Sequence, residues 1–150
     1  MTRNRKAFTL IEVLIVVIIM AVLAATIIPQ FSSSTEDAKN STLSFNLHTI
    51  RSQIEMYKVH HLGNVPSLAN FADQMTKATN VDGGFDGDTP YGPYIQGELP
   101  VNPFNHSRDV VAVASAGDVP EAVVAGGAGW QYDETTGGFY PNNAEWYAQQ

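Results

Sequence analysis

An apolar run of 21 residues, from Phe8 to Ile28, dominates the first part of the chain. Glu12 is the one charged residue within the run, and Pro29 follows its last residue. A helix rises about 1.5 Å per residue, so this run would be roughly 30 Å long, which is the thickness of the hydrocarbon core of a bilayer. The pattern therefore predicts a membrane-spanning helix over 8–29.

A second helical pattern follows the polar stretch 30–35. Its apolar positions recur at steps of four, three, four and three, which places them on one face of a helix. These positions are Leu43, Leu47, Ile50, Ile54 and Tyr57. The spacing predicts an amphipathic helix that packs on a core. We expect Phe45, Met56 and Val59, which lie off this stripe, to widen the buried face; contact with neighbouring copies is the alternative.

The two ends of this second helix carry their own signals. Pro29, and the capping-box spacing of Ser33 and Glu36, predict that the helix is kinked or locally interrupted and then restarts. His60 and His61 close it. Adjacent helical residues do not face each other, so this pair favours interaction with the helix C-terminus over a metal site.

The remainder of the chain changes character twice. Ser67 is expected to cap a short helix whose apolar face holds Leu68, Phe71, Ala72 and Met75. Glycine, proline and aspartate then predict a long structured loop over 80–105.

Short apolar runs near the C-terminus predict three or four antiparallel strands. The runs are 110–114, 122–125, 130–132 and 138–140. Together with the amphipathic helix as a cover, they predict an α+β fold in which the helix packs on a small antiparallel sheet. Trp146 and Tyr147, in the last ten residues, either pack back on the domain or form a contact surface.

Composition narrows the classes of function. The formal charge is −7, which disfavours nucleic acid as a partner, and there is no cysteine for a disulfide. The three basic residues Arg3, Arg5 and Lys6 fit a cytoplasmic flank, so the rest of the chain is expected on the outer side. The sequence has no Gly-x-Ser-x-Gly elbow, phosphate loop or dinucleotide fingerprint, and we expect no enzyme activity.

Glu12 is expensive at the hydrocarbon boundary, by about 2 to 3 kcal/mol, and needs a cationic partner. If the chain were cut between Ala7 and Phe8, the new amine would lie one helical turn away and could pair with a carboxylate of its own or a neighbouring chain. A secretory signal peptide cut near residues 22–25, and a generic single-pass anchor, are the alternatives for this segment.

The basic leader, Phe8, Glu12 at the fifth position after Ala7, and Pro29 resemble the type IV prepilin leader of type IV pilins and pseudopilins. The resemblance implies cleavage before Phe8, N-methylation of Phe8 by the same prepilin peptidase/methyltransferase, and helical polymerisation in which Glu12 meets the Phe8 amine of an adjacent subunit. Ala7 stands where the family usually has glycine. Processing is expected to survive, because alanine is the next smallest residue.

The absence of cysteine and the elements 91–95 and 99–104 resemble the major pseudopilin of type II secretion systems. This resemblance implies a leader over 1–7, an inner-membrane assembly helix over 8–29 and a periplasmic domain over 30–150. It also implies a homopolymer that works with minor pseudopilins and an inner-membrane assembly platform to export proteins. A type IV pilus subunit, and a membrane-tethered domain that does not polymerise, are the alternatives.

Calcium is the cofactor that this resemblance brings in, because the family often binds it in a loop of the soluble domain. The candidate ligands are Asp82, Asp86, Asp88 and Asp109. Their oxygens on a flexible loop suit calcium, although the spacing is not that of an EF-hand. A solvated acidic loop is the alternative. Asn102 replaces the aspartate of the family's Pro-x-Asp-Pro element.

Overall fold

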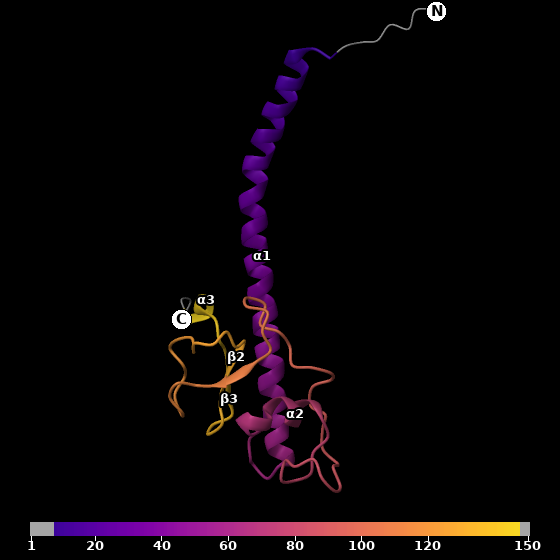
Figure 1. Ribbon diagram of the computed structural model, residues 1–150, viewed down its shortest axis with the longest axis vertical. Coiled ribbons are helices and arrows are strands. Elements are labelled where there is room, and N and C mark those ends of the chain that lie inside the picture. Colours follow the sequence, from indigo (N-terminus) through magenta and orange to yellow (C-terminus); the bar gives the residue numbers. More distant parts are fainter. Residues whose placement is uncertain (1–7, 148–150) are drawn as a thin grey trace, which may run out of the picture. The chain divides into compact units, whose positions relative to one another are not determined.

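The computed structural model describes residues 8–147, without the side chains of 28–33 and 145. Its elements, in chain order, are α1 (Leu10–His60), η1 (Leu68–Asn70), α2 (Phe71–Thr76), β1 (Val110–Ala112), β2 (Trp130–Asp133), β3 (Gly138–Pro141) and α3 (Ala144–Tyr147). The chain divides into two compact units, Met1–Ala38 and Lys39–Gln150. In the second unit, the last turns of α1 lie beside α2 and the strands (Figure 1).

Helix α1 is helical without a break from Leu10 to His60, through both Pro29 and the Ser33–Glu36 pair. The predicted interruption and restart are therefore wrong. A proline removes one N–H donor, while the hydrogen bonds of the turns on either side keep the helix going. Ser33 and Glu36 have the spacing of a capping box, but the same spacing also occurs within a helix. The kink at Pro29 stays a prediction.

The amphipathic stripe of α1 is confirmed as the centre of the core. Leu43, Leu47, Ile50, Ile54 and Tyr57 are all buried. Residues from α2, β2 and β3 complete the cluster, among them Phe71, Met75, Trp130, Tyr132 and Phe139. Helix and sheet thus enclose one apolar core, as expected for an α+β fold.

Phe45, Met56 and Val59 do not widen this core. Their side chains are 71%, 48% and 76% exposed. At about 100° per residue, the three positions lie within one narrow sector on the side of α1 opposite the buried stripe. The expectation of core packing was therefore wrong.

The sheet has three strands in the order β1-β2-β3 and is mixed. Strand β1 pairs with β2 in parallel, with Val110 opposite Trp130, whereas β2 and β3 are antiparallel, with Tyr132 opposite Phe139. The expectation of an all-antiparallel sheet is thus wrong for β1. A crossover connection over 113–129 returns the chain so that β2 runs in the same direction as β1.

The predicted strand over 122–125 lies in this crossover and is not a strand. Within this run, the backbone polar groups of Val124 are satisfied by a side chain instead of a neighbouring strand. Val124 donates its N–H to Asn142 Oδ1 at 2.7 Å, and Asn142 Nδ2 donates to the Val124 carbonyl at 2.9 Å. A valine-rich run is compatible with a strand, but here an asparagine far along the sequence takes the place of the strand partner.

The short helix after Pro66 is present, but Ser67 does not cap it with its side chain. Instead, Gln74 reaches back from α2, and its Oε1 accepts the Ser67 N–H at 2.7 Å. Phe71 and Met75 are buried as expected, whereas Ala72 is exposed. The helix was predicted correctly, and its cap was not.

The C-terminal aromatic residues pack back on the domain. Trp146 packs against the core cluster, and the Tyr147 hydroxyl donates to the Pro141 carbonyl at 3.0 Å and accepts from Gln131 Nε2 at 2.8 Å. This settles the choice left open for the tail in favour of packing, as far as Tyr147, the last described residue.

Candidate functional site

The first turn of α1 contains a reciprocal pair of hydrogen bonds between Thr9 and Glu12. Glu12 Oε2 accepts the backbone N–H and the hydroxyl of Thr9, each at 2.9 Å. In return, the Thr9 hydroxyl oxygen accepts the Glu12 N–H at 3.4 Å. This is a capping box, in which two donors that a helix N-terminus leaves unpaired find acceptors.

Our reading of the sequence missed this cap, although Thr9-Leu10-Ile11-Glu12 carries its spacing. Glu12 was interpreted only as a charge that needs a cation. The structure shows that the carboxylate also lies at the N-terminal end of α1, where the helix dipole favours a negative charge. Both bonds go to Oε2, and within residues 8–147 Oε1 accepts no hydrogen bond. One oxygen of this exposed carboxylate is thus available to a cation from outside the chain.

The helix that follows Glu12 is apolar and exposed along its length. Between Leu10 and Ile27 it is long and apolar enough to cross a membrane by length and composition, and it is the one such helix within the described residues. Its large side chains are about half exposed or more. The Thr26 hydroxyl donates to the Leu23 carbonyl at 3.0 Å, so this polar group is satisfied within the helix. The surface suits lipid tails or other apolar helices.

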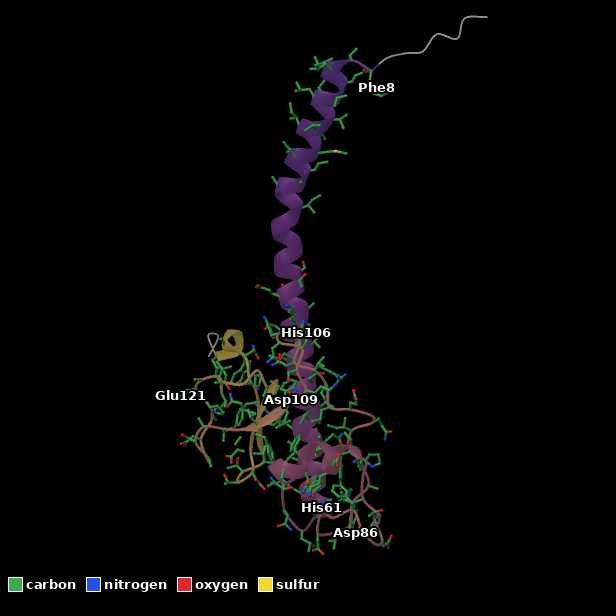
Figure 2. The ribbon with its side chains drawn as sticks, viewed as in Figure 1. Phe8, His61, Asp86, His106, Asp109 and Glu121 are labelled. Carbon is green, nitrogen blue, oxygen red and sulfur yellow. The ribbon has the colours of Figure 1, made fainter. Side chains whose placement is uncertain are left out.

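The predicted processing site is described in part. Phe8 lies just before α1, and its side chain is 84% exposed (Figure 2). Ala7 lies outside the described residues. Pro29 lies within the continuous helix α1. Of the predicted N-terminal residues, Phe8 and Glu12 come together at the start of one helix.

The calcium candidates are not brought together as a set. Asp86 and Asp109 lie in separate parts of the domain (Figure 2). Among residues 8–147, no three His, Cys, Asp or Glu side chains are placed to hold a metal ion. Asn80 organises the acidic loop, because its Oδ1 accepts the N–H groups of Asp82 and Gly84 at 3.1 and 2.8 Å. Calcium at these positions remains an expectation from the family alone.

The histidine pair is held by the domain. His61 is 1% exposed, and its ring stacks on Tyr57 with 3.6 Å between ring centroids. Its Nδ1 donates to the Tyr57 carbonyl at 2.8 Å, and its Nε2 accepts from the Thr79 hydroxyl at 3.0 Å. The interaction of His61 with the C-terminal turn of α1 is confirmed, and both of its ring nitrogens are engaged within the protein.

Residues 2–28 match the model of the prokaryotic N-terminal methylation motif. The chain is 28% identical over 123 residues to type II secretion system core protein G of Pseudomonas aeruginosa, covering 77% of this chain and 79% of that protein. It is 24% identical over 135 residues to the Vibrio cholerae protein of the same name, covering 90% and 89%.

A second kind of relative matches a shorter part of the chain. The type IV wide pilus major component PilA4 of Thermus thermophilus is 40% identical over 57 residues, which is 38% of this chain and 44% of that protein. No solved structure matches. The chain is thus similar over residues 2–28 to proteins that carry the N-terminal methylation motif, and over most of its length to type II secretion system core protein G.

Proposed function

We propose that this protein is the structural subunit of a type II secretion pseudopilus, a fibre built by helical polymerisation to drive protein export. The observation that carries the proposal is the start of α1, where an available carboxylate is followed by a long, exposed apolar helix. Such a helix needs an apolar environment. Burial among other copies of the same helix gives it one outside the bilayer, while the similarity to core protein G supports the secretion branch.

Glu12 would set the register of the fibre. Removal of residues 1–7 makes Phe8 the first residue and gives it a free amine. In the fibre, Glu12 Oε1 would accept this amine from a neighbouring subunit while Oε2 remains on Thr9. A buried carboxylate without a cation is costly, so each subunit would stop at the axial position where the pair forms.

The finer partners follow from this role. A prepilin peptidase/methyltransferase would cut between Ala7 and Phe8 and methylate Phe8. The protein would then cross the inner membrane once, with its N-terminus in the cytoplasm and its domain in the periplasm. From there an inner-membrane assembly platform would draw it into a fibre that also contains minor pseudopilins. The role is mechanical and includes no catalysis and no nucleic acid.

Mass analysis of the mature N-terminus tests the processing step. We expect a chain that begins with N-methylated Phe8. A chain that begins near Thr26, as after signal-peptide cleavage, or one that retains Met1, would rule out the pilin-like role. Ala7→Gly is the matched variant, because it restores the residue usual in the family and is expected to be processed at least as fast as the wild type.

Replacement of Glu12 tests the register. Glu12→Gln keeps an oxygen that can accept from Thr9, so the cap survives, but it has no charge to offer an amine. We expect this variant and Glu12→Ala to insert into the membrane normally and to be absent from sheared or purified fibres. If Glu12→Gln assembles at the wild-type level, the charge pair does not set the register. If the wild-type protein never forms fibres, the membrane-tethered alternative holds.

The similarity to a type IV pilus component supports one second candidate, a subunit of a surface pilus. The chemistry of assembly would be the same, and only the fate of the fibre would differ. Deletion of the gene separates the two. Loss of protein export with surface fibres unchanged supports the pseudopilus, whereas loss of surface fibres with export unchanged supports the pilus.

A further inference from the structure

Asn102 is fully buried in the second unit and joins three segments of the domain. Its Nδ2 donates to the Gly129 carbonyl at 2.8 Å and to Asn143 Oδ1 at 3.3 Å. Its Oδ1 accepts the Phe104 N–H at 3.0 Å. One neutral side chain thus connects the loop before β1 to the residue before β2 and to the segment after β3.

Two further asparagines serve the same junction. Asn105 Nδ2 and Asn142 Nδ2 both donate to the Ala128 carbonyl at 2.9 Å. The neighbouring carbonyl, that of Gly129, takes the bond from Asn102. Both backbone oxygens of the turn into β2 therefore face amide donors. We name Asn102, Asn105 and Asn142 the amide clamp.

The resemblance to the pseudopilin family led us to expect calcium in the soluble domain. The hydrogen-bond donors at this junction do not suit that ion. Calcium binds oxygen ligands. The amide nitrogen Asn102 Nδ2 is a hydrogen-bond donor and does not ligate a cation. The carbonyl oxygens of Ala128 and Gly129 are already taken by such donors. Asp109, the acidic candidate in this loop, has its Oδ2 accepting from the Ser107 hydroxyl at 3.3 Å.

The backbones at the junction are also in direct contact. Gly129 and Trp130 both donate their N–H groups to the Asp109 carbonyl at 3.0 Å. A Cβ placed on Gly129 would collide with the Ser107 carbonyl oxygen. Direct hydrogen bonds between the two backbones thus tie these segments together at this point.

From these contacts we infer that the amide clamp holds this junction without a cation, so that the stability it gives the domain does not depend on calcium. An aspartate at position 102 would accept hydrogen bonds and attract calcium. The asparagine donates two bonds in its place and needs no counter-charge. The junction is therefore held by groups that the chain supplies itself.

The melting temperature of the mature full-length protein in detergent tests this inference, followed by the fluorescence of Trp130 and Trp146. The wild type is measured in millimolar calcium and in EGTA. We expect the two melting temperatures to agree within about 1 °C, because a ligand that binds only the native state would raise the midpoint. A rise of several degrees in calcium would overturn the inference, and this measurement requires no variant to fold.

Asn102→Asp then tests the clamp. The variant loses both donors and turns a carboxylate toward two acceptors, so in EGTA we expect its melting temperature to fall by about 5 °C or more. Asn64→Asp, at an exposed position, makes the same change of charge and is expected to melt as the wild type does. If Asn102→Asp has the same melting temperature as the wild type, the amide clamp does not stabilise the domain. No fibre is needed, so the result is independent of the proposed role in assembly.

Discussion

Glu12 and Thr9 hold each other at the start of α1, with Glu12 Oε2 2.9 Å from both the backbone nitrogen and the hydroxyl of Thr9. Glu12, which is proposed to set the axial position of a subunit in the fibre, is thus part of a helix cap within a single subunit. The cap fixes where the carboxylate points. It also gives the charge two hydrogen bonds while the subunit waits in the membrane, which reduces the cost of having no cation.

Thr9→Val separates the cap from the charge. Valine has nearly the shape of threonine and lacks the hydroxyl, so the variant loses one bond to Glu12 Oε2 and the acceptor for the Glu12 N–H. Loss of such a cap costs about 0.5 to 2 kcal/mol of helix stability. Because the carboxylate keeps its charge, we expect fibres to form, in contrast to Glu12→Gln. The yield of sheared fibres, compared at equal membrane levels, measures this. A Thr9→Val strain as poor in fibres as Glu12→Gln would make the cap, and not the charge, the basis of assembly.

Asp133 predicts a dependence of stability on acid. Burial by itself would raise the pKa of this carboxyl, but hydrogen bonds from the Thr135 hydroxyl, the Gly117 and Thr135 N–H groups and the Thr136 hydroxyl outweigh it, so the pKa lies well below its ordinary value of 3.8. A group with a lowered folded pKa contributes its stability above the unfolded pKa. That contribution is lost as the pH falls below 3.8 toward the folded value.

Asp133→Asn checks this contribution. An amide cannot accept all four bonds, so we expect the variant to be about 1 to 3 kcal/mol less stable than the wild type at neutral pH. The gap between the two melting temperatures should narrow in acid, where the wild type loses its own contribution. Asp118→Asn, at an exposed position of the crossover, serves as the control and is expected to change little. A gap that stays constant down to strongly acidic pH would mean that the carboxylate charge is not what stabilises this turn.

The residues that the sequence predicted well are those whose environment repeats along one element. The stripe from Leu43 to Tyr57 needs only the period of a helix, and the apolar run needs only its length. The direction of β1 relative to β2 follows from the crossover over 113–129, in which Val124 is held by two hydrogen bonds with Asn142. No local sequence pattern predicts this contact, because Val124 and Asn142 are 18 positions apart.

The residues discussed for the site also divide into those that local spacing predicts and those that depend on contacts distant in the sequence. Phe8, Glu12 and the apolar helix could be singled out because their spacing is local, and the roles of Phe8 and Glu12 stay predictions. The Thr9 cap could have been identified by the same kind of inspection. Ser33 and Glu36 share that spacing and lie inside α1, so spacing alone does not say where a helix begins. Asn102 was noted only as a replaced aspartate. Its bonds to Gly129 and Asn143 come from segments 27 and 41 residues away.

The C-terminal end of α1 offers a stabilising change. Leu62 has a φ of 58°, a conformation that costs about 1 to 2 kcal/mol for residues with a Cβ. The Gly63 N–H closes the helix by donating to the Lys58 carbonyl at 2.8 Å. The Leu62 side chain is 81% exposed, so little burial is lost with it.

We expect Leu62→Gly to raise the free energy of unfolding by about 0.5 to 1 kcal/mol, since part of the relief is offset by the greater freedom of glycine in the unfolded chain. Denaturant titration of the mature protein measures it. Leu62→Ala keeps the Cβ and removes the same exposed surface, so it should gain nothing. Equal gains in both variants would point to the loss of exposed leucine and not to the backbone.

Phe45 and Leu47 lie two residues apart on opposite faces of α1, and we expect truncation of the two side chains to have different effects. Phe45 is 71% exposed and Leu47 is 6% exposed. Phe45→Ala should change the free energy of unfolding of the dispersed protein by no more than about 0.5 kcal/mol, because alanine is the better helix former and no packing is lost. Leu47→Ala should cost about 2 to 5 kcal/mol, because it leaves a cavity beneath the sheet. Denaturant titrations in detergent, below the concentration at which fibres form, compare the two. A loss at Phe45 as large as that at Leu47 would mean that this face of α1 is covered within a single subunit.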